Sequence, residues 1–222
     1  SKPLDYFKFI NKHLNNEGLF VLDVPNLDGI NNGLIIDDYF YDKHRSYYEI
    51  RILDYLTQIN KMRIVDKIET SSSVLLLIKK TEDVSNPEMP KENYKTNTEN
   101  IQTYLSALNS NRKKAPEVVK KINKEIKGKH SKPIIFFGAG RLFDGLIKYG
   151  GLEINNIDYL VDSYLYDATD KIHNLQLDKI DLLEREKDGT VFVSAKTSSN
   201  EITKLLKEKY KVNNVVLISE YF

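Results

Sequence analysis

The sequence predicts an α/β protein with two sheets, a small one that contains an antiparallel hairpin and a larger parallel one. Three observations support this fold class. From about residue 132 onward, apolar runs typical of buried strands alternate with amphipathic helical patterns, which indicates right-handed βαβ crossovers. Before that point, strand-like runs at 63–69 and 73–80 are separated by a short polar stretch, as in a β-hairpin. Residues 81–100 contain two prolines and little apolar content, as in a linker or surface loop.

The first half begins with a helical pattern, in which apolar residues recur at intervals of three or four. We expect Gly18 to cap this helix in a left-handed conformation. Residues 19–25, LFVLDVP, form an apolar run interrupted only by Asp23, which predicts a buried strand. A loop rich in Gly and Asn follows, and then a second helix whose apolar face contains Ile52, Leu53, Leu56 and Ile59.

The second half begins with a long helix from residue 101, which Pro116 is expected to end or kink. Four buried strands then follow at 133–138, 157–162, 190–195 and 214–219. Helical patterns at 141–150 and 199–210 connect them, the second with Ser199 or Asn200 as its N-cap.

Composition excludes several classes of function. The chain has 222 residues, with 33 basic and 32 acidic side chains, so no net charge drives binding to nucleic acid. It contains no cysteine, which excludes disulfides and thiolate metal sites and fits a cytoplasmic protein. No apolar run approaches the length of a membrane span, and the start lacks the pattern of a signal peptide. The histidines are scattered along the sequence, at His13, His44, His130 and His173. We therefore expect no zinc site.

A glycine turn in the second half is a candidate phosphate or nucleotide site. Gly138 and Gly140 lie between a buried strand and a helix, and Arg141 adds a cation in the first helical turn. Asp162 follows the next strand, where the acid that binds a ribose is found in dinucleotide-binding folds. Phe143 occupies the position of the third glycine of G-x-G-x-x-G, so the motif is incomplete. The alternative is a tight strand-to-helix turn that binds no ligand.

The stretch YDKHRSYYE, residues 41–49, is the candidate catalytic strip. His44 is the candidate base, because an unperturbed histidine side chain titrates near pH 6.5, at about neutral pH. Tyr41 and Tyr47 are candidate donors to a developing oxyanion. The alternative is an ordinary polar helix start with Asp42 as its N-cap and His44 as a surface or half-buried polar residue. The sequence leaves both open.

Together these segments resemble the C-terminal two-thirds of a family of SAM-dependent C-methyltransferases that act on nucleotide-linked keto-sugars. Residues 16–26, NEGLFVLDVPN, resemble the fifth strand of a class I methyltransferase sheet, and the runs at 63–69 and 73–80 resemble its antiparallel last pair. The sequence FFGAGRLFDGLIKYGG and the strand IDYLVD resemble the start of the family's separate Rossmann-like C-terminal domain. The resemblance implies a partial methyltransferase domain at 1–80, a linker and helix at 81–130, and the Rossmann-like domain at 131–222.

The chain departs from the family in three places. The Gly-rich loop that binds SAM in the family, E-x-G-x-G-x-G, does not occur here. The family motif Tyr-His-Glu-His-x-Ser-Tyr is matched at Tyr41, His44, Ser46 and Tyr47, but Lys43 replaces its glutamate. The family motif G-G-S-x-R near the hairpin turn is here S-S-S-V-L. We therefore expect half of a class I sheet, with a strand edge and apolar faces that another part of the protein or a partner covers.

The resemblance implies a methyltransferase that acts on a sugar, a nucleotide-linked sugar or a similar small molecule, with SAM as cofactor and substrate held between the two halves. Lys43 suggests a changed reaction, such as O- or N-methylation, or lost activity. A second hypothesis is a non-catalytic nucleotide-sugar-binding module. In a third hypothesis, both halves of the chain serve as an interface between subunits, which predicts a stable homodimer. We expect neither nucleic acid nor membrane as partner.

Overall fold

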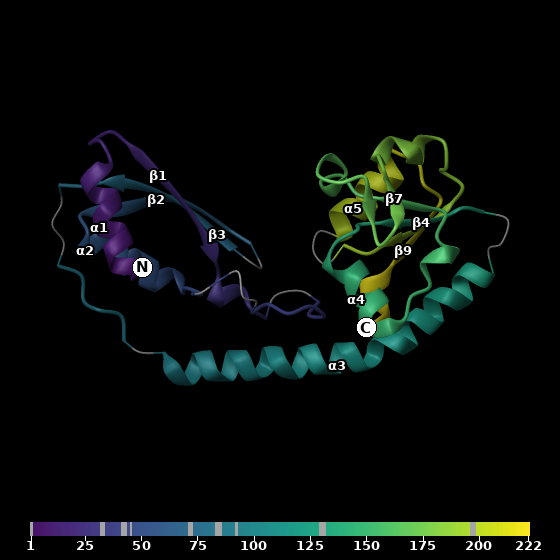
Figure 1. Cartoon of the computed structure of the whole chain (residues 1–222), viewed down its shortest axis with the longest axis horizontal. Coiled ribbons are helices and arrows are strands. Elements are labelled where there is room, and N and C mark those ends of the chain that lie inside the picture. Colours follow the sequence, from purple (N-terminus) through teal and green to yellow (C-terminus); the bar gives the residue numbers. More distant parts are fainter. Residues whose placement is uncertain are drawn as a thin grey trace. The chain divides into compact units, whose positions relative to one another are not determined.

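The structure is a computed structural model that describes residues 2–31, 34–40, 44, 46–70, 73–82, 86–91, 93–128, 132–195 and 199–222. The chain forms two compact units. Unit 1 comprises residues 1–32 and 38–104, and unit 2 comprises residues 33–37 and 105–222. Each unit has its own sheet (Figure 1), and buried apolar side chains of each unit pack against that sheet.

Unit 1 is a three-stranded antiparallel sheet with two helices. Helix α1 (Pro3–His13) precedes strand β1 (Leu19–Pro25), and helix α2 (Ile50–Ile59) precedes the hairpin of β2 (Met62–Glu69) and β3 (Ser73–Lys80). The predicted strand and hairpin are confirmed, and the sheet order is β1-β3-β2. The prediction that residues 19–25 are buried is wrong, because β1 alternates between exposed and half-buried residues. Gly18 is not in the left-handed region. The expectation of a glycine cap is wrong, because α1 ends at His13 and the chain leaves it through an extended Leu14.

Helices α1 and α2 pack on one face of the unit 1 sheet. Phe7 of α1 and Leu53 of α2 form a core with Val74, Leu76 and Ile78 of β3. Residues on the other face alternate with these, as the period of a strand requires. That second face is open to solvent and carries apolar side chains beside the charged Asp23 and Asp66: Leu19 is 56% exposed, Val21 58% and Ile68 60%. Apolar runs on both faces are typical of strands that are covered on both sides.

Unit 2 contains a six-stranded sheet of the order β6-β7-β5-β4-β8-β9. All pairings are parallel except that of β6 with β7, so the prediction of a parallel sheet holds with an antiparallel edge strand added. The strands are β4 (Ile134–Phe137), β5 (Tyr159–Val161), β6 (Lys171–Ile172), β7 (Leu175–Asp178), β8 (Thr190–Val193) and β9 (Asn214–Leu217).

Helices cover both faces of the unit 2 sheet. Helix α4 (Arg141–Gly150) and the second part of α3 (Tyr94–Lys127) share a core with Phe136 and Phe192. Helix α5 (Ser199–Glu208) lies on the other face, where Leu206 shares a core with Ile135 and Val193. The successive residues of β4 therefore point into two different cores, and all four are buried.

Helix α3 is longer than predicted, because it starts before residue 101 and does not end at Pro116. It begins at Tyr94, within the segment predicted as a linker, and it continues through Pro116 to Lys127. The helix is not interrupted because Ala115, Val119 and Ile122 bury one continuous apolar face in unit 2, which offsets the hydrogen bond that proline removes. No helix in the described ranges is long and apolar enough to cross a membrane.

Substitution of Gly150 tests the close packing of α4 on α3. A Cβ atom there would lie 2.5 Å from Cγ2 of Val119 and 2.9 Å from the carbonyl oxygen of Ala115. We expect Gly150→Ala to lower the free energy of unfolding of unit 2 by about 1–3 kcal/mol, measured by urea denaturation. Gly140→Ala is the control, because a Cβ at Gly140 meets nothing within 4 Å. Stabilisation by Gly150→Ala, as helix propensity alone predicts, would contradict this packing.

Candidate functional site

The candidate strip returns to the carboxyl end of β1. The amide of Leu27 donates to the carbonyl of Tyr48 at 2.9 Å, and the amide of Tyr48 donates to the carbonyl of Pro25 at 3.3 Å. This pairing places Asn26, which is buried, beside Tyr48. The second part of the strip is therefore fixed where β1 ends.

A tyrosine cluster, formed by Tyr39, Phe40, Tyr47 and Tyr104, anchors the chain before the strip. The hydroxyl of Tyr39 donates to the carbonyl of Asn26, and the hydroxyl of Tyr104 accepts from the amide of Tyr39 at 2.6 Å. The rings pack edge to face, with Phe40 and Tyr47 centroids 4.8 Å apart. Such contacts add to the hydrophobic gain of burying aromatic rings.

The three predicted catalytic residues have different positions. His44 is exposed, and its ring centroid lies 6.0 Å from that of Tyr47. Tyr47 is half-buried, and its hydroxyl donates to the carbonyl of Tyr39 at 2.9 Å. Tyr41 lies outside the described residues. The structure thus brings His44 and Tyr47 together, and it gives the Tyr47 hydroxyl a structural acceptor.

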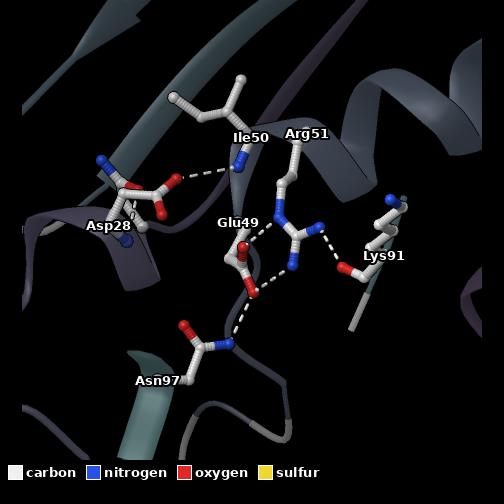
Figure 2. Close-up of polar contacts among 7 residues, drawn as sticks. Asp28, Glu49, Ile50, Arg51, Lys91 and Asn97 are labelled. Carbon is white, nitrogen blue, oxygen red and sulfur yellow. Dashed lines mark hydrogen bonds and ion pairs between the residues drawn. The ribbon is translucent and has the colours of Figure 1, made fainter. Parts of the chain in front are cut away.

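The interpretation of the strip as a helix start with Asp42 as N-cap is wrong. Helix α2 begins at Ile50, with Glu49 in extended conformation as its N-cap residue. The carboxylate of Asp28, rather than a side chain of the strip, accepts from the amide of Ile50 at 3.0 Å (Figure 2). Asp42 itself lies outside the described residues.

A buried carboxylate at the end of the strip was not predicted as a site residue. Glu49 is 7% exposed, and both of its oxygens accept hydrogen bonds from the guanidinium of Arg51. Asn97 of α3 donates to the same carboxylate at 2.6 Å, and Arg51 also donates to the carbonyl of Lys91 (Figure 2). The hydrogen bonds from Arg51 lower the pKa of Glu49 despite its burial, so the group is ionised at neutral pH.

The glycine turn of unit 2 connects β4 to α4. Gly138 has φ +102°, and a Cβ there would lie 3.2 Å from the amide nitrogen of Ala195, so both its backbone conformation and its surroundings favour glycine. Gly140 has no such restriction, because a Cβ would meet nothing within 4 Å. It is the N-cap residue of α4 and has an extended conformation. The space beside Gly140 is what a ligand at this helix terminus needs.

Asp162 and Arg141 have partners within the protein. One oxygen of Asp162 accepts from the amide of Ala139 at 2.9 Å, and the other accepts from the amides of Tyr164 and Leu165, each at 2.9 Å. The carboxylate therefore ties the glycine turn to the loop after β5, and these bonds use most of its acceptor capacity. Arg141 forms an ion pair with Asp37 at 3.0 Å.

Beside the turn, the structure adds a pair that was not predicted. Nε2 of His173 lies 2.6 Å from the carboxylate of Asp144. His173 and Asn174 both have positive φ in the tight turn between β6 and β7. The signal in the sequence is an Asn in a two-residue gap between apolar residues, which is typical of a hairpin.

The described glycines of unit 1 are Gly18 and Gly29, and neither lies in a turn from a strand to an α-helix. The glycine turn of unit 2 has such a geometry, but Asp162 has little capacity left for a ribose hydroxyl. Within the described ranges, no three His, Cys, Asp or Glu side chains gather as metal ligands.

Comparison with known proteins adds no identification. No protein-family model matches the chain, and no curated protein matches it.

Substitution of Glu49 tests the buried ion pair. We expect Glu49→Gln to lower the free energy of unfolding of unit 1 by about 1–3 kcal/mol at neutral pH, because Arg51 loses its charged acceptor. The folded-state pKa of Glu49 is lowered from 4.5, so its contribution is complete above that value and is lost as the pH falls through the folded-state pKa. Denaturation followed by circular dichroism at several pH values should show the difference between the two proteins shrinking in acid.

Glu17→Gln is the matched control. Glu17 pairs with Lys79 at 2.7 Å but is exposed, and exposed ion pairs contribute little to stability. Equal effects of the two substitutions would show that burial does not strengthen the Glu49 interaction.

Proposed function

We propose that this chain is the C-terminal part of a SAM-dependent methyltransferase that acts on a sugar, a nucleotide-linked sugar or a similar small molecule. The observation that supports the proposal best is the order β1-β3-β2 with antiparallel pairing. It agrees with the sequence resemblance of β1 to the fifth strand of a class I sheet and of β2 and β3 to its antiparallel last pair. The donor SAM would then be held by a part of the protein other than the described residues.

The open faces of unit 1 support the same proposal. β1 is an edge strand of the sheet, and an edge of this kind accepts a further strand. Leu19 and Val21 of β1 are exposed on the face opposite to α1 and α2. Further strands and helices of a class I domain would bury this surface.

His44 is the residue that we propose as base. Methylation of a carbon beside a carbonyl requires removal of the carbon-bound proton, and the enolate oxygen that forms needs hydrogen-bond donors. The imidazole of His44 is exposed, so a substrate can reach it. The Tyr47 hydroxyl already donates to the protein backbone, so we assign Tyr47 to positioning the strip, and Tyr41 is the remaining candidate donor.

A second candidate function, a nucleotide-sugar-binding module without catalysis, is favoured by the sheet topology of unit 2. The chain moves from β4 to β5 on one side and returns to β8 on the other side. Ligands of open α/β sheets bind beyond the carboxyl ends of the strands at such a switch point. Gly138 and Ser194 follow β4 and β8 at this place, and the amide of Ser194 donates to the carbonyl of Phe137 at 2.9 Å.

The methyltransferase proposal is tested by calorimetry with SAM and by a methyl-transfer assay on the full-length gene product that contains this chain. We expect SAM to bind to the full-length product and not to this chain alone. His44→Ala in the full-length product should lower methyl transfer by about 10²–10⁴-fold and leave SAM affinity unchanged.

His13→Ala is the matched control for the same assay. The His13 ring lies 2.8 Å from the carbonyl of Phe9 within its own helix and is remote in sequence from the strip, so the variant should retain full activity. Failure of the full-length product to bind SAM would overturn the methyltransferase proposal.

The binding-module function makes a different prediction. Gly140→Asp places a carboxylate at the N-terminus of α4, where it is a favourable N-cap and repels a phosphate. We expect this variant to remain folded and to lose binding of UDP-glucose, measured by calorimetry, while His44→Ala binds as tightly as the unsubstituted chain. Unchanged binding by Gly140→Asp would exclude the glycine turn as the site.

A further inference from the structure

A groove of about 810 Å³ lies between the C-terminal part of α3 and the end of α4, within unit 2. Its lining includes four lysines of α3, namely Lys120, Lys121, Lys124 and Lys127. A smaller cavity of about 340 Å³ shares Asn123 and Lys127 with the groove, and its lining also includes Lys132, Glu153 and Asp158. The two volumes are in the range of sites for small ligands.

The groove is the centre of a basic segment in a chain that is otherwise balanced. Residues 112–132 contain nine basic and two acidic side chains, whereas the whole chain contains 33 and 32. Glu125, one of the two acids, accepts a hydrogen bond from the hydroxyl of Tyr221. Among the described residues, Lys120, Lys124 and Lys127 form no ion pair with a carboxylate.

The lysines repel one another on the helix surface. Lys120 and Lys124 are separated by four positions, and Lys124 and Lys127 by three, so their side chains are neighbours on one face. Like charges at these spacings destabilise a helix. Lys124 and Lys127 lie near the C-terminus of α3, where the helix dipole stabilises cations. That stabilisation does not extend back to Lys120 and Lys121, so it does not account for their positions.

Backbone and an amide complete the site. Gly150 packs against Val119 without a side chain, and Gly151 has φ +70° with open space at its Cβ position, so the wall of the groove formed by α4 is backbone. Oδ1 of Asn123 is buried and has no hydrogen-bond partner among the described residues. An unpaired buried acceptor is costly unless a donor reaches it, such as a bound water or the P–OH group of a singly protonated diphosphate.

We propose that this groove binds a small ligand with two or more negative charges, of the diphosphate class. Lysine ammonium groups bind phosphate as point charges, and a diphosphate would relieve the repulsion between neighbouring lysines. The groove is open to solvent but limited in size, which favours a small anion over a polymer, and Glu117, which also lines it, disfavours an extended anionic chain. The inference does not depend on the proposed function, because neither the strip nor the glycine turn contributes to the groove.

Calorimetry of the whole chain with sodium pyrophosphate tests the inference. We compare the double variant Lys120→Gln/Lys124→Gln with Lys204→Gln/Lys207→Gln, which removes two exposed lysines of α5. Glutamine has a helix propensity close to that of lysine, so both variants should fold. We expect the groove variant to bind at least about tenfold more weakly and the α5 variant to bind as the unsubstituted chain does, with affinity that falls as salt is added.

Amide chemical shifts locate the ligand. Pyrophosphate should shift the amide signals of Gly150 and Gly151 in ¹⁵N–¹H spectra. Shifts at Gly138 and Gly140 instead, equal affinities of the two double variants, or no binding at millimolar pyrophosphate would each overturn the proposal. Much tighter binding of a single-stranded oligonucleotide, with shifts along the length of α3, would replace the small anion by a nucleic acid and would also overturn it.

Discussion

The burial of β4 on both faces is the constraint on which the structure of unit 2 depends. Ile134 and Phe136 enter the core beneath α3 and α4, whereas Ile135 and Phe137 enter the core beneath α5. A strand that is apolar on both faces requires helices on both sides of the sheet. Right-handed crossovers then require the chain to reverse direction across the sheet next to β4. The glycine turn after Phe137 lies at this reversal, so the same constraint selects the place of the candidate ligand site.

Unit 1 contains the same kind of strand without the same covering. The apolar residues of β1 alternate between a helix-covered core and an exposed face, and β1 is an edge strand of the sheet that the described residues form. At the carboxyl end of β1, the Tyr39 hydroxyl donates to the carbonyl of Asn26 and the Tyr47 hydroxyl donates to the carbonyl of Tyr39. Glu49 and Arg51 then fix the start of α2 and the segment before α3. Residues 47–49 of the strip are therefore held by their neighbours, while His44 stays exposed.

The candidate site could be predicted only in part from the sequence. The glycine turn was evident because Gly138 follows a buried strand directly, and the spacing to Asp162 was also evident. The partners of these residues were not, since Asp37 and Arg141 are 104 positions apart and nothing local indicates their ion pair. The same holds for Glu49 and Asn97, 48 positions apart. His173 and Asp144 meet only because the β6–β7 hairpin, a short element with a weak signal, turns back over α4.

The sequence by itself determined the type of most helices and strands, because apolar periodicity and strand-ending residues such as Pro25 act within a few positions. It also determined that no cysteine chemistry occurs. Only the tertiary structure decided how far the elements extend: α3 continues through Pro116 because Ala115 and Val119 bury their side chains against unit 2. It also decided which face of the β1-β3-β2 sheet is covered, and that the lysines of α3 line a groove with the end of α4. Long-range packing is the physical reason in each case, since burial depends on residues that are distant in the sequence.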